Sequence, residues 1–247
     1  MFSASAEYYD LIYSTFKDYA GESARIDRLL REIHPPCRTV LDVACGTGEH
    51  IRCLAGLGFE VDGLDLDPAF LRIARQKHPS GRFFEADMSG FHVPRRYDAV
   101  LCLFSSIGYL PTLDRVTCAL TCFRDHLEAD GVVLVEPWFG PGALDPDRVT
   151  QITGEAEGIR VTRASRIEIE GRLSRLFFDY DITDASGTRQ AREIHELALF
   201  TTGEMEQAFR DAGLETTFDP AGLSDRGLFV AKPFSGSRKR AGAAGPG

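Results

Sequence analysis

The sequence has no long hydrophobic run and no leader-like start. Its longest uninterrupted apolar segment, residues 99–104, is far shorter than the ~18 residues that a transmembrane helix needs. The first ten residues also lack the basic segment and the apolar segment of a signal peptide. We therefore expect a cytoplasmic protein with no membrane partner.

An excess of basic residues is missing as well. The 247 residues include 28 Lys and Arg against 37 Asp and Glu, which gives a net charge of −9. Three of the basic residues fall in residues 233–247, a Gly- and Ala-rich end expected to be a disordered tail, and without them the balance is −12. Binding to nucleic acid requires a basic face that neutralises phosphates, so nucleic acid is not an expected partner.

The six cysteines form no Cys-x-x-Cys pair, and most lie within apolar segments. Cys118 and Cys122 are four residues apart on a predicted helix, but no histidine or further cysteine pair joins them at zinc spacing. We interpret the cysteines as reduced thiols of the core, and we predict no metal site.

Short apolar segments alternate with segments of helical periodicity through most of the chain. Helices are predicted at residues 22–33, from the glycine turn to Leu54, and at 68–77, 113–127 and 202–212. Seven strands are predicted at residues 39–44, 59–66, 82–86, 97–104, 132–136, 214–218 and 227–231. This alternation predicts an α/β fold, with a doubly wound and mostly parallel seven-stranded sheet covered on both faces.

Between residues 159 and 200, apolar and polar residues alternate with a period of two. Segments 159–170, 172–183 and 189–200 predict half-exposed antiparallel hairpins. We interpret residues 139–195 as a β-hairpin insertion in a single domain that spans residues 1–232. The insertion holds eight arginines and no lysine, and because ten acidic residues share it, most of these arginines are expected on a solvated face.

A glycine turn, residues 44–48, joins the first strand to the next helix. Gly46 and Gly48 allow a close approach between the backbone and a nucleotide. A dinucleotide site favours a third glycine where Ile51 stands, and Glu49 would repel a pyrophosphate. These residues favour S-adenosylmethionine, which has no phosphate, over a nicotinamide cofactor.

Acidic residues follow the next two predicted strands. Asp65 is placed to accept hydrogen bonds from both ribose hydroxyls, while Asp67 is interpreted as the N-cap of the helix that Pro68 opens. After the third strand, Asp87 is expected near an adenine amino group and Met88 against the adenine ring. The order of these features at successive strand ends predicts a nucleoside site.

Residues 41–48, 63–66, 87–88 and 97–98 together resemble the successive motifs of the class I S-adenosylmethionine-dependent methyltransferases, which have a Rossmann-like sheet. Further segments resemble one branch, the N,N-dimethyltransferases of nucleotide-linked amino sugars in macrolide pathways. They are residues 9–11, 17–19, 104–108, 136–138, 162–165 and 226–229. The resemblance extends from about residue 9 to residue 230.

The resemblance implies roles for particular residues. Those expected at the cofactor, with the two turn glycines included, are Tyr9, Ala44, Gly46, Gly48, Asp65, Asp87 and Met88. Those expected at the substrate pocket are Glu136, Trp138, Arg163, Ser165 and Arg226. Arg163 and Arg226 are predicted to clamp a nucleotide diphosphate, because guanidinium groups suit phosphate.

The chain departs from these amino-sugar enzymes at two places. They carry a histidine, their favoured proton acceptor, where this chain has Tyr109, and a longer N-terminal arm. A tyrosine is a poor base at its ordinary pKa, so Tyr109 is interpreted as a catalytic, substrate-positioning hydroxyl, with simple packing as the alternative. His126 is interpreted as a helix-capping cation, and His195 is a less favoured candidate base.

Aromatic residues also gather near the start of the chain, at positions 8, 9, 13, 16 and 19. They are interpreted either as a lid over the cofactor or as one face of an amphipathic helix packed on the core.

The predicted function is S-adenosylmethionine-dependent N-methylation of a small molecule, an amino sugar carried on a nucleotide of the TDP type. Methylation of another natural product that is not linked to a nucleotide, at oxygen or nitrogen, is the alternative. A cofactor-binding protein without catalysis and a nicotinamide-dependent oxidoreductase are weaker hypotheses. The oligomeric state stays open between monomer and homodimer.

Overall fold

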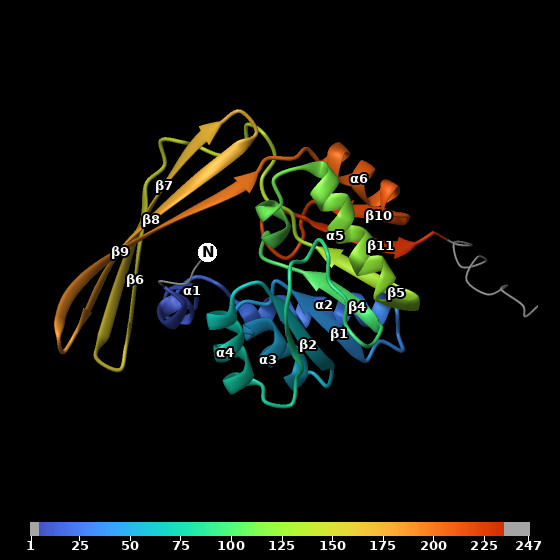
Figure 1. The fold of residues 1–247 in the computed structure, drawn as a ribbon, viewed down its shortest axis with the longest axis horizontal. Helices are drawn as coiled ribbons and strands as arrows, with labels where there is room; N and C mark the ends of the chain where they lie inside the picture. The colour runs from blue at the N-terminus through green and yellow to red at the C-terminus, as the bar shows by residue number, and fades with distance from the viewer. Residues whose placement is uncertain (1–4, 235–247) are drawn as a thin grey trace, which may run out of the picture.

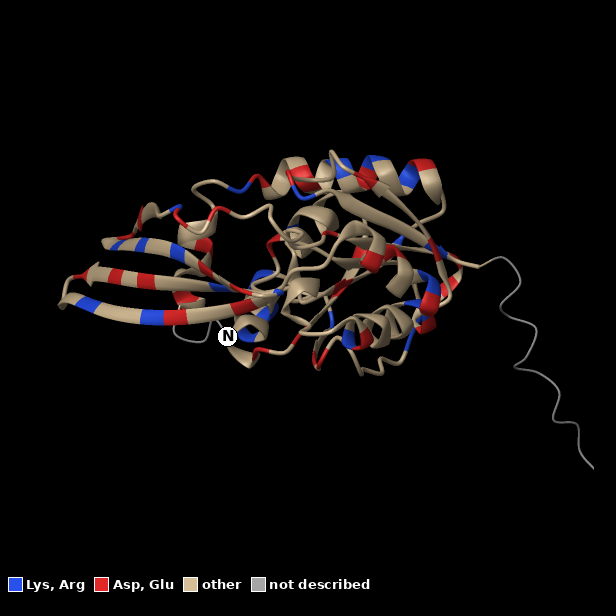
Figure 2. Ribbon diagram, turned by 90° about the horizontal axis from the view of Figure 1, so that it is seen from above, with Lys and Arg blue, Asp and Glu red and all other residues tan. Residues whose placement is uncertain are grey.

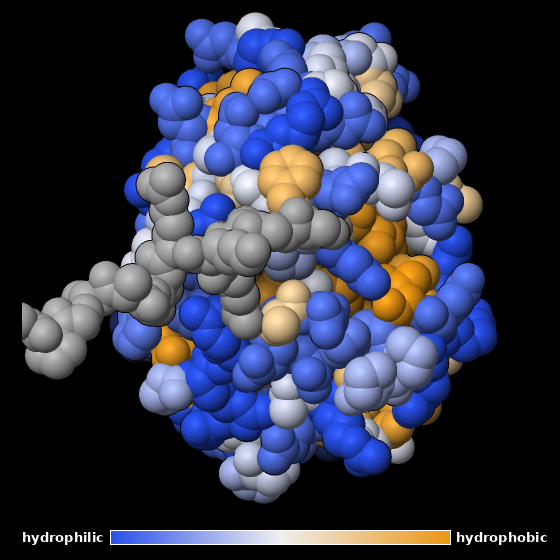
Figure 3. All heavy atoms as spheres, turned by 90° about the vertical axis from the view of Figure 1, so that its right-hand side faces the viewer, coloured by the Kyte–Doolittle hydropathy of each residue, from blue (hydrophilic) through white to orange (hydrophobic). Residues whose placement is uncertain are grey.

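The computed structural model describes residues 5–234, and the statements below concern that part of the chain. Of the predicted tail, residues 235–247 lie outside the described residues. Among the described residues, no helix is both long enough and apolar enough to cross a membrane. The face shown in Figure 3 is largely hydrophilic, with small separate hydrophobic patches.

A seven-stranded sheet forms the centre of the α/β part, in the order β10-β11-β5-β4-β1-β2-β3. The parallel strands are β1 (Thr39–Val43), β2 (Glu60–Asp65), β3 (Phe83–Glu85), β4 (Tyr97–Cys102) and β5 (Leu127–Val135). The last two strands, β10 (Leu214–Asp219) and β11 (Leu228–Pro233), form an antiparallel hairpin, and β11 pairs antiparallel with β5. The predicted mostly parallel, seven-stranded sheet is confirmed.

Helices cover both faces of this sheet (Figure 1). They are α2 (Tyr19–Ile33), α3 (Glu49–Gly56), α4 (Pro68–Lys77), α5 (Leu113–Asp125) and α6 (Thr202–Asp211). On β1, Val40 belongs to the core that α2 and α3 cover, whereas the next residue, Leu41, belongs to the core that α5 and α6 cover. Adjacent strand residues thus face two separate hydrophobic layers, as a doubly wound fold requires.

Four antiparallel strands form a second sheet beside the first (Figure 1). They are β6 (Thr150–Ala156), β7 (Ile159–Glu170), β8 (Leu173–Asp184) and β9 (Gly187–Ala198). The short helices η1 (Ala6–Tyr8) and α1 (Tyr9–Tyr13) pack against its inner face, where Ile12 and Tyr13 join Val161 and Phe178 in a third hydrophobic core. The hairpins over β7, β8 and β9 were predicted, and β6 was not.

The outer face of this second sheet is charged, and blue and red bands alternate along its strands in Figure 2. Its exposed arginines pair with neighbouring carboxylates, as expected for a solvated face. On the outer face these are Arg160, Arg166, Arg175 and Arg192. Arg172, in the turn before β8, pairs with Glu204 of α6, and Arg189, on the inner side of β9, pairs with Asp184 and contacts Tyr8. Arg163 differs from them because it lies on the inner face and is buried.

Several predicted boundaries were wrong, including the end of α3, which is Gly56 instead of Leu54, and the start of β5, which is Leu127 instead of residue 132. Helix α2 begins at Tyr19 instead of residue 22, because the Asp18 carboxylate caps it by accepting the Gly21 N–H at 2.9 Å. Helix α5 ends at Asp125 instead of residue 127, because Leu127 is buried and pairs with Tyr97 as the first residue of β5.

Candidate active site

A cavity of about 360 Å³ opens at the carboxyl ends of β1, β2 and β3. This is where parallel α/β sheets bind their ligands. The predicted site residues that line it are Tyr9, Ala44, Gly46, Asp65, Asp87, Met88 and Tyr109. A smaller cavity of about 40 Å³ shares Tyr9, Ala44, Gly46 and Ser106 with it and adds Phe104. The structure therefore brings together residues from the whole first half of the chain.

Asp65 links the end of β2 to the glycine turn. One oxygen of its carboxylate accepts the Gly46 N–H at 2.8 Å, and the other accepts the Asp67 N–H at 2.9 Å. Burial raises the pKa of Asp65, and these backbone N–H groups oppose that rise because they stabilise the carboxylate. The group is thus held rigidly at the cavity wall, where its remaining lone pairs can accept hydrogen bonds from a ligand.

The glycine turn places its two glycines differently. Gly46 has φ +56°, and a Cβ added there would meet no atom within 4 Å, so its backbone is open to a ligand. Gly48, with φ +80°, is the N-cap of α3, and an added Cβ would lie 3.2 Å from the Ala74 Cβ of α4. Gly48 does not line the cavity, so the structure assigns it to the turn and to helix packing. Ala44, with φ +57°, is a non-glycine residue in the strained left-handed region at the cavity.

Asp87 follows β3 and is fixed at the wall of the cavity. One carboxylate oxygen accepts the Ser89 N–H at 2.8 Å and the Ser89 hydroxyl at 2.6 Å, and the other pairs with Arg115 at 2.7 Å. These contacts, those of Ser89 foremost, hold the pKa of Asp87 below its usual value. Arg115 also lines the cavity, together with the apolar Phe70 and Pro111. These three residues could not be predicted from the sequence, because none belongs to a chemical motif.

The aromatic residues near the start of the chain divide between two roles. Tyr9 lines both cavities and Tyr19 lines the smaller one, as a lid would. Tyr8 and Tyr13 are buried against the second sheet, and Phe16 is exposed. These residues do not form one amphipathic helix, because they are divided among η1, α1, the segment after it and the start of α2, and the lid stays a prediction for Tyr9 and Tyr19.

Tyr109 comes from the short helix η2 (Ser106–Tyr109) and reaches the cavity with 40% of its surface exposed. Its hydroxyl lies 3.1 Å from Nδ1 of His195 on β9. Although part of the residue faces the open cavity, desolvation by the surrounding protein raises the pKa of Tyr109 well above its ordinary value, so the phenol is neutral and is not a base by itself. His195 is only 2% exposed and also lines the cavity.

Arg163 is buried on the inner face of β7, with 5% of its surface exposed. Its guanidinium lies over the rings of Phe178 and Tyr13, at 4.4 and 5.0 Å from their centroids. Nε and Nη1 have no hydrogen-bond partner, and neither does the buried Oγ of Ser165, two residues along the same face. Unpaired buried donors are costly, so their presence indicates a site shaped for an acceptor that binds there.

Glu136 follows β5 and is fully buried. Its carboxylate accepts the Phe104 N–H at 2.6 Å and pairs with Arg226 at 3.1 Å. Phe104 and Ser105 both have left-handed backbone conformations, with φ of +52° and +62°, so the carboxylate holds a strained turn in place. Glu136 is thus placed to position Arg226 and the turn, since its own side chain is inaccessible.

Trp138 lies close to the same turn. Its indole N–H donates to the Ser174 hydroxyl at 2.9 Å, and a Cβ added to Gly108 would come within 2.7 Å of the Trp138 Cβ. Glycine is therefore needed where η2 passes the tryptophan.

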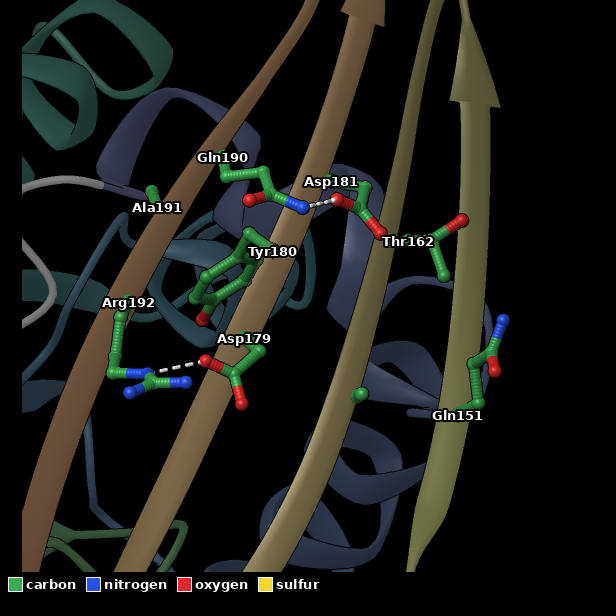
Figure 4. Close-up of a pocket in the computed structure, with 9 residues that line it drawn as sticks. Gln151, Thr162, Asp179, Tyr180, Asp181, Gln190, Ala191 and Arg192 are labelled. Atoms are coloured by element: carbon green, nitrogen blue, oxygen red, sulfur yellow. Dashed lines mark hydrogen bonds and ion pairs between the residues drawn. The ribbon is translucent and has the colours of Figure 1, made fainter.

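A larger hollow, of about 450 Å³, lies on the outer face of the second sheet (Figure 4). Its polar side chains already pair with one another, Arg192 with Asp179 at 2.5 Å and Gln190 with Asp181 at 2.9 Å. None of the predicted site residues lines it. We therefore take the cavity at the strand ends as the candidate active site.

Comparison with known proteins identifies the family. Residues 40–131 match the model of a methyltransferase domain. The chain is 42% identical to the dTDP-3-amino-3,6-dideoxy-alpha-D-glucopyranose N,N-dimethyltransferase of Streptomyces fradiae, over 92% of this chain and 90% of that relative. The chain belongs to the amino-sugar N,N-dimethyltransferase branch of the S-adenosylmethionine-dependent methyltransferases.

Two solved structures resemble this methyltransferase closely. DesVI of Streptomyces venezuelae is 37% identical, with a TM-score of 0.88 over 92% of this chain and 98% of that one. CalS10 of Micromonospora echinaspora, an amino pentose methyltransferase of calicheamicin biosynthesis solved with S-adenosylmethionine, is 34% identical, with a TM-score of 0.79 over 88% and 92% of the two chains. The methyltransferase uses S-adenosylmethionine, as predicted.

The cavity of the methyltransferase fits this cofactor. Asp65 offers hydrogen-bond acceptors at the end of β2, and Gly46 leaves its backbone open to a ligand. Glu49 in the first turn of α3 pairs with Lys77 at 2.8 Å and with Arg52, so a carboxylate occupies the helix end where a pyrophosphate would bind. The two carboxylates and the open glycine backbone suit a nucleoside without phosphate.

His126 does not act as the cation that we predicted. Its Nδ1 donates to the Cys122 carbonyl oxygen at 2.7 Å, so the side chain caps the end of α5 as expected. Its Nε2, however, accepts the Val93 N–H at 3.2 Å, which requires a neutral ring in this arrangement.

Cys118 is exposed, and so departs from the prediction of core thiols.

Proposed function

We propose that the methyltransferase transfers two methyl groups in succession from S-adenosylmethionine to the amino nitrogen of a sugar carried on thymidine diphosphate. The names of its relatives support this acceptor, and so does the arrangement of cations beside the cavity. The buried guanidinium of Arg163, with two donor atoms lacking partners, is the observation that carries the proposal.

Three cations gather around two aromatic rings, one of which, Phe104, lines the smaller cavity. Lys17 and Arg226 lie 4.0 and 5.1 Å from the ring centroid of Phe104. The ring centroids of Phe104 and Tyr13 are 5.3 Å apart, and the Arg163 guanidinium lies 5.0 Å from the Tyr13 centroid. Burial raises the pKa of Tyr13, and the positive charges of Arg163 and Arg226 oppose the rise. A diphosphate would supply oxygen acceptors for Nε and Nη1 of Arg163, whereas Lys17 and Arg226 each already pair with a carboxylate, Glu22 and Glu136.

The cofactor would occupy the cavity at the strand ends. We assign the ribose hydroxyls to Asp65 and the adenine to Asp87 and Met88. Tyr9, Ala44 and Gly46 would enclose the rest of the molecule at the junction with the smaller cavity.

When bound, S-adenosylmethionine supplies an electrophilic methyl group on a sulfonium. The protein aligns the acceptor nitrogen with that methyl group, and alignment provides much of the acceleration of an in-line displacement. Trp138 and Ser165 would border the sugar, and Tyr109 would hold its amino group. An amine that is protonated at neutral pH must lose a proton before it reacts.

Calorimetry with thymidine diphosphate, in the presence of S-adenosylhomocysteine, tests the acceptor class. We expect the wild-type enzyme to bind the nucleotide and Arg226→Ala to bind it at least about tenfold more weakly, because a charge-assisted bond is lost. The matched control is Arg192→Ala, which removes an exposed arginine on the outer face and should leave affinity unchanged. Absence of binding, or equal binding by Arg226→Ala, contradicts the proposal.

A further inference from the structure

We infer that His195 receives the proton of the substrate ammonium group through the hydroxyl of Tyr109, and that Glu193 stabilises the imidazolium that forms. The inference rests on the proposed function, since it requires an amine as acceptor. Tyr109 would touch the substrate, and His195 would act through it as a positioning and proton-accepting residue.

The fold brings the three side chains together from distant segments. Of the described residues that line the 360 Å³ cavity, His195 is the one that the second sheet contributes. Its Nδ1 meets the Tyr109 hydroxyl at 3.1 Å, across 86 positions of sequence. Its Nε2 lies 3.5 Å from Oε2 of Glu193, two residues away on the same face of β9. The series thus runs from the cavity into the protein interior.

Glu193 is organised to remain a carboxylate. It is 6% exposed and accepts the backbone N–H of Ser5 at 3.0 Å, the Ser5 hydroxyl at 2.9 Å and the Tyr180 hydroxyl at 3.2 Å. Burial alone would raise the pKa of Glu193, but His195 and these donors hold it below its usual value. The carboxylate therefore favours the tautomer with a proton on Nε2, which leaves Nδ1 as the acceptor facing Tyr109.

Proton transfer along this series balances. The Tyr109 oxygen takes a proton from the substrate ammonium while its own proton moves to Nδ1 of His195. The products are a neutral amine, an intact phenol and an imidazolium paired with Glu193. The amine lone pair then forms the C–N bond as the methyl–sulfur bond breaks. The second methylation needs one more deprotonation by the same route, after the first proton has returned through Tyr109 to solvent.

The other groups that face His195 support an imidazolium there. The ring of Phe178 on β8 lies 5.1 Å from it, and the neutral hydroxyls of Tyr13 and Tyr180 lie nearby. Asp65 acts on the same side as Glu193, since both negative charges raise the pKa of Tyr109. Two positive charges lie toward this region, Arg115, which lines the same cavity and pairs with Asp87, and Arg163, which lies over Phe178 and which a bound diphosphate would neutralise.

The pH dependence of kcat with a TDP-linked amino sugar tests the relay. We expect His195→Gln to lower kcat about 100-fold near neutral pH with little change in KM, because general-base catalysis contributes ~10² or more. The loss should shrink as pH rises, since the amine then deprotonates without help. Tyr109→Phe should lose as much, and the double variant no more. The matched control is Glu196→Gln on the outer face of β9, which should match the wild type.

A rescue experiment separates proton transfer from a structural role. In the His195→Gln background, Tyr109→His places an imidazole directly at the cavity and should restore most of the lost kcat. Unchanged kcat and pH profile in His195→Gln overturns the relay, and so does a rise in KM at constant kcat or a failure of the rescue.

A measurement without substrate keeps the relay separate from the proposed function. Nitrogen NMR of the histidine-labelled enzyme should show His195 protonated at Nε2, and Glu193→Gln should shift that tautomer balance. The opposite tautomer in the wild type overturns the relay, whatever the acceptor is. If the wild type shows the expected tautomer but does not methylate a TDP-linked amino sugar, the proposed function alone fails.

Discussion

Replacing Arg163 by methionine should separate ligand binding from folding. The substitution keeps the apolar stem and removes the guanidinium, whose Nε and Nη1 have no partner in the free protein. Each unpaired buried donor costs about 1–3 kcal/mol, and each lost ring contact costs about 0.5–2 kcal/mol. Since the two effects oppose each other, we expect the free energy of unfolding of ligand-free Arg163→Met to stay within about 1 kcal/mol of the wild type.

Nucleotide binding should respond very differently to this change. Two charge-assisted hydrogen bonds to a diphosphate are worth about 3 kcal/mol or more together, which corresponds to an affinity loss of about 150-fold. Urea unfolding of the ligand-free protein and calorimetry with thymidine diphosphate measure the two quantities. Stability that falls by about 3 kcal/mol while affinity is unchanged would refute the reasoning, because Arg163 would then be a structural cation.

Three further substitutions test other parts of the account. Burial raises the pKa of the Asp42 carboxyl to about 7. The folded protein therefore keeps a proton that the unfolded chain loses near pH 4, and its free energy of unfolding falls as pH rises from about 4 to 7. Asp42→Asn should remove this pH dependence and stabilise the free enzyme at pH 8 by up to about 4 kcal/mol, as measured by thermal or urea unfolding. Gly48→Ala should cost about 1–2 kcal/mol of stability, from its positive φ, with little change in S-adenosylhomocysteine affinity, whereas Gly46→Ala should weaken that affinity. Glu136→Gln removes the buried negative charge that pairs with Arg226 and should lower the unfolding free energy by about 3 kcal/mol, and a loss under about 0.5 kcal/mol would contradict that role.

The central sheet was predictable because the sequence signals of its strands and of the helices between them are local. Buried parallel strands are short apolar runs, and Asp67 with Pro68 marks the start of α4, where the carboxylate caps Ala69 at 2.9 Å. Strand β6 was missed because, in residues 150–156, only Ile152 and Ala156 are apolar, which makes the alternation of this edge strand a weak signal.

The candidate site was predictable only in part, for a related reason. Residues that follow strand ends, such as Asp65 and Asp87, meet at one edge of a parallel sheet, so their order along the chain reveals the site. The contact between Tyr109 and His195 depends on how the second sheet is placed relative to the first, which no local sequence pattern encodes. The role of Glu136 likewise became visible only with its burial and its contact to Phe104.

Mass spectrometry of the reaction product tests the central claim most directly. The enzyme is incubated with S-adenosylmethionine bearing a labelled methyl group and with a TDP-linked amino sugar, and the product is fragmented to locate the label. We predict two labelled methyl groups, both on the amino nitrogen, and no product from the same sugar without its nucleotide. Methyl groups on oxygen, or equal turnover of the nucleotide-free sugar, would contradict the account.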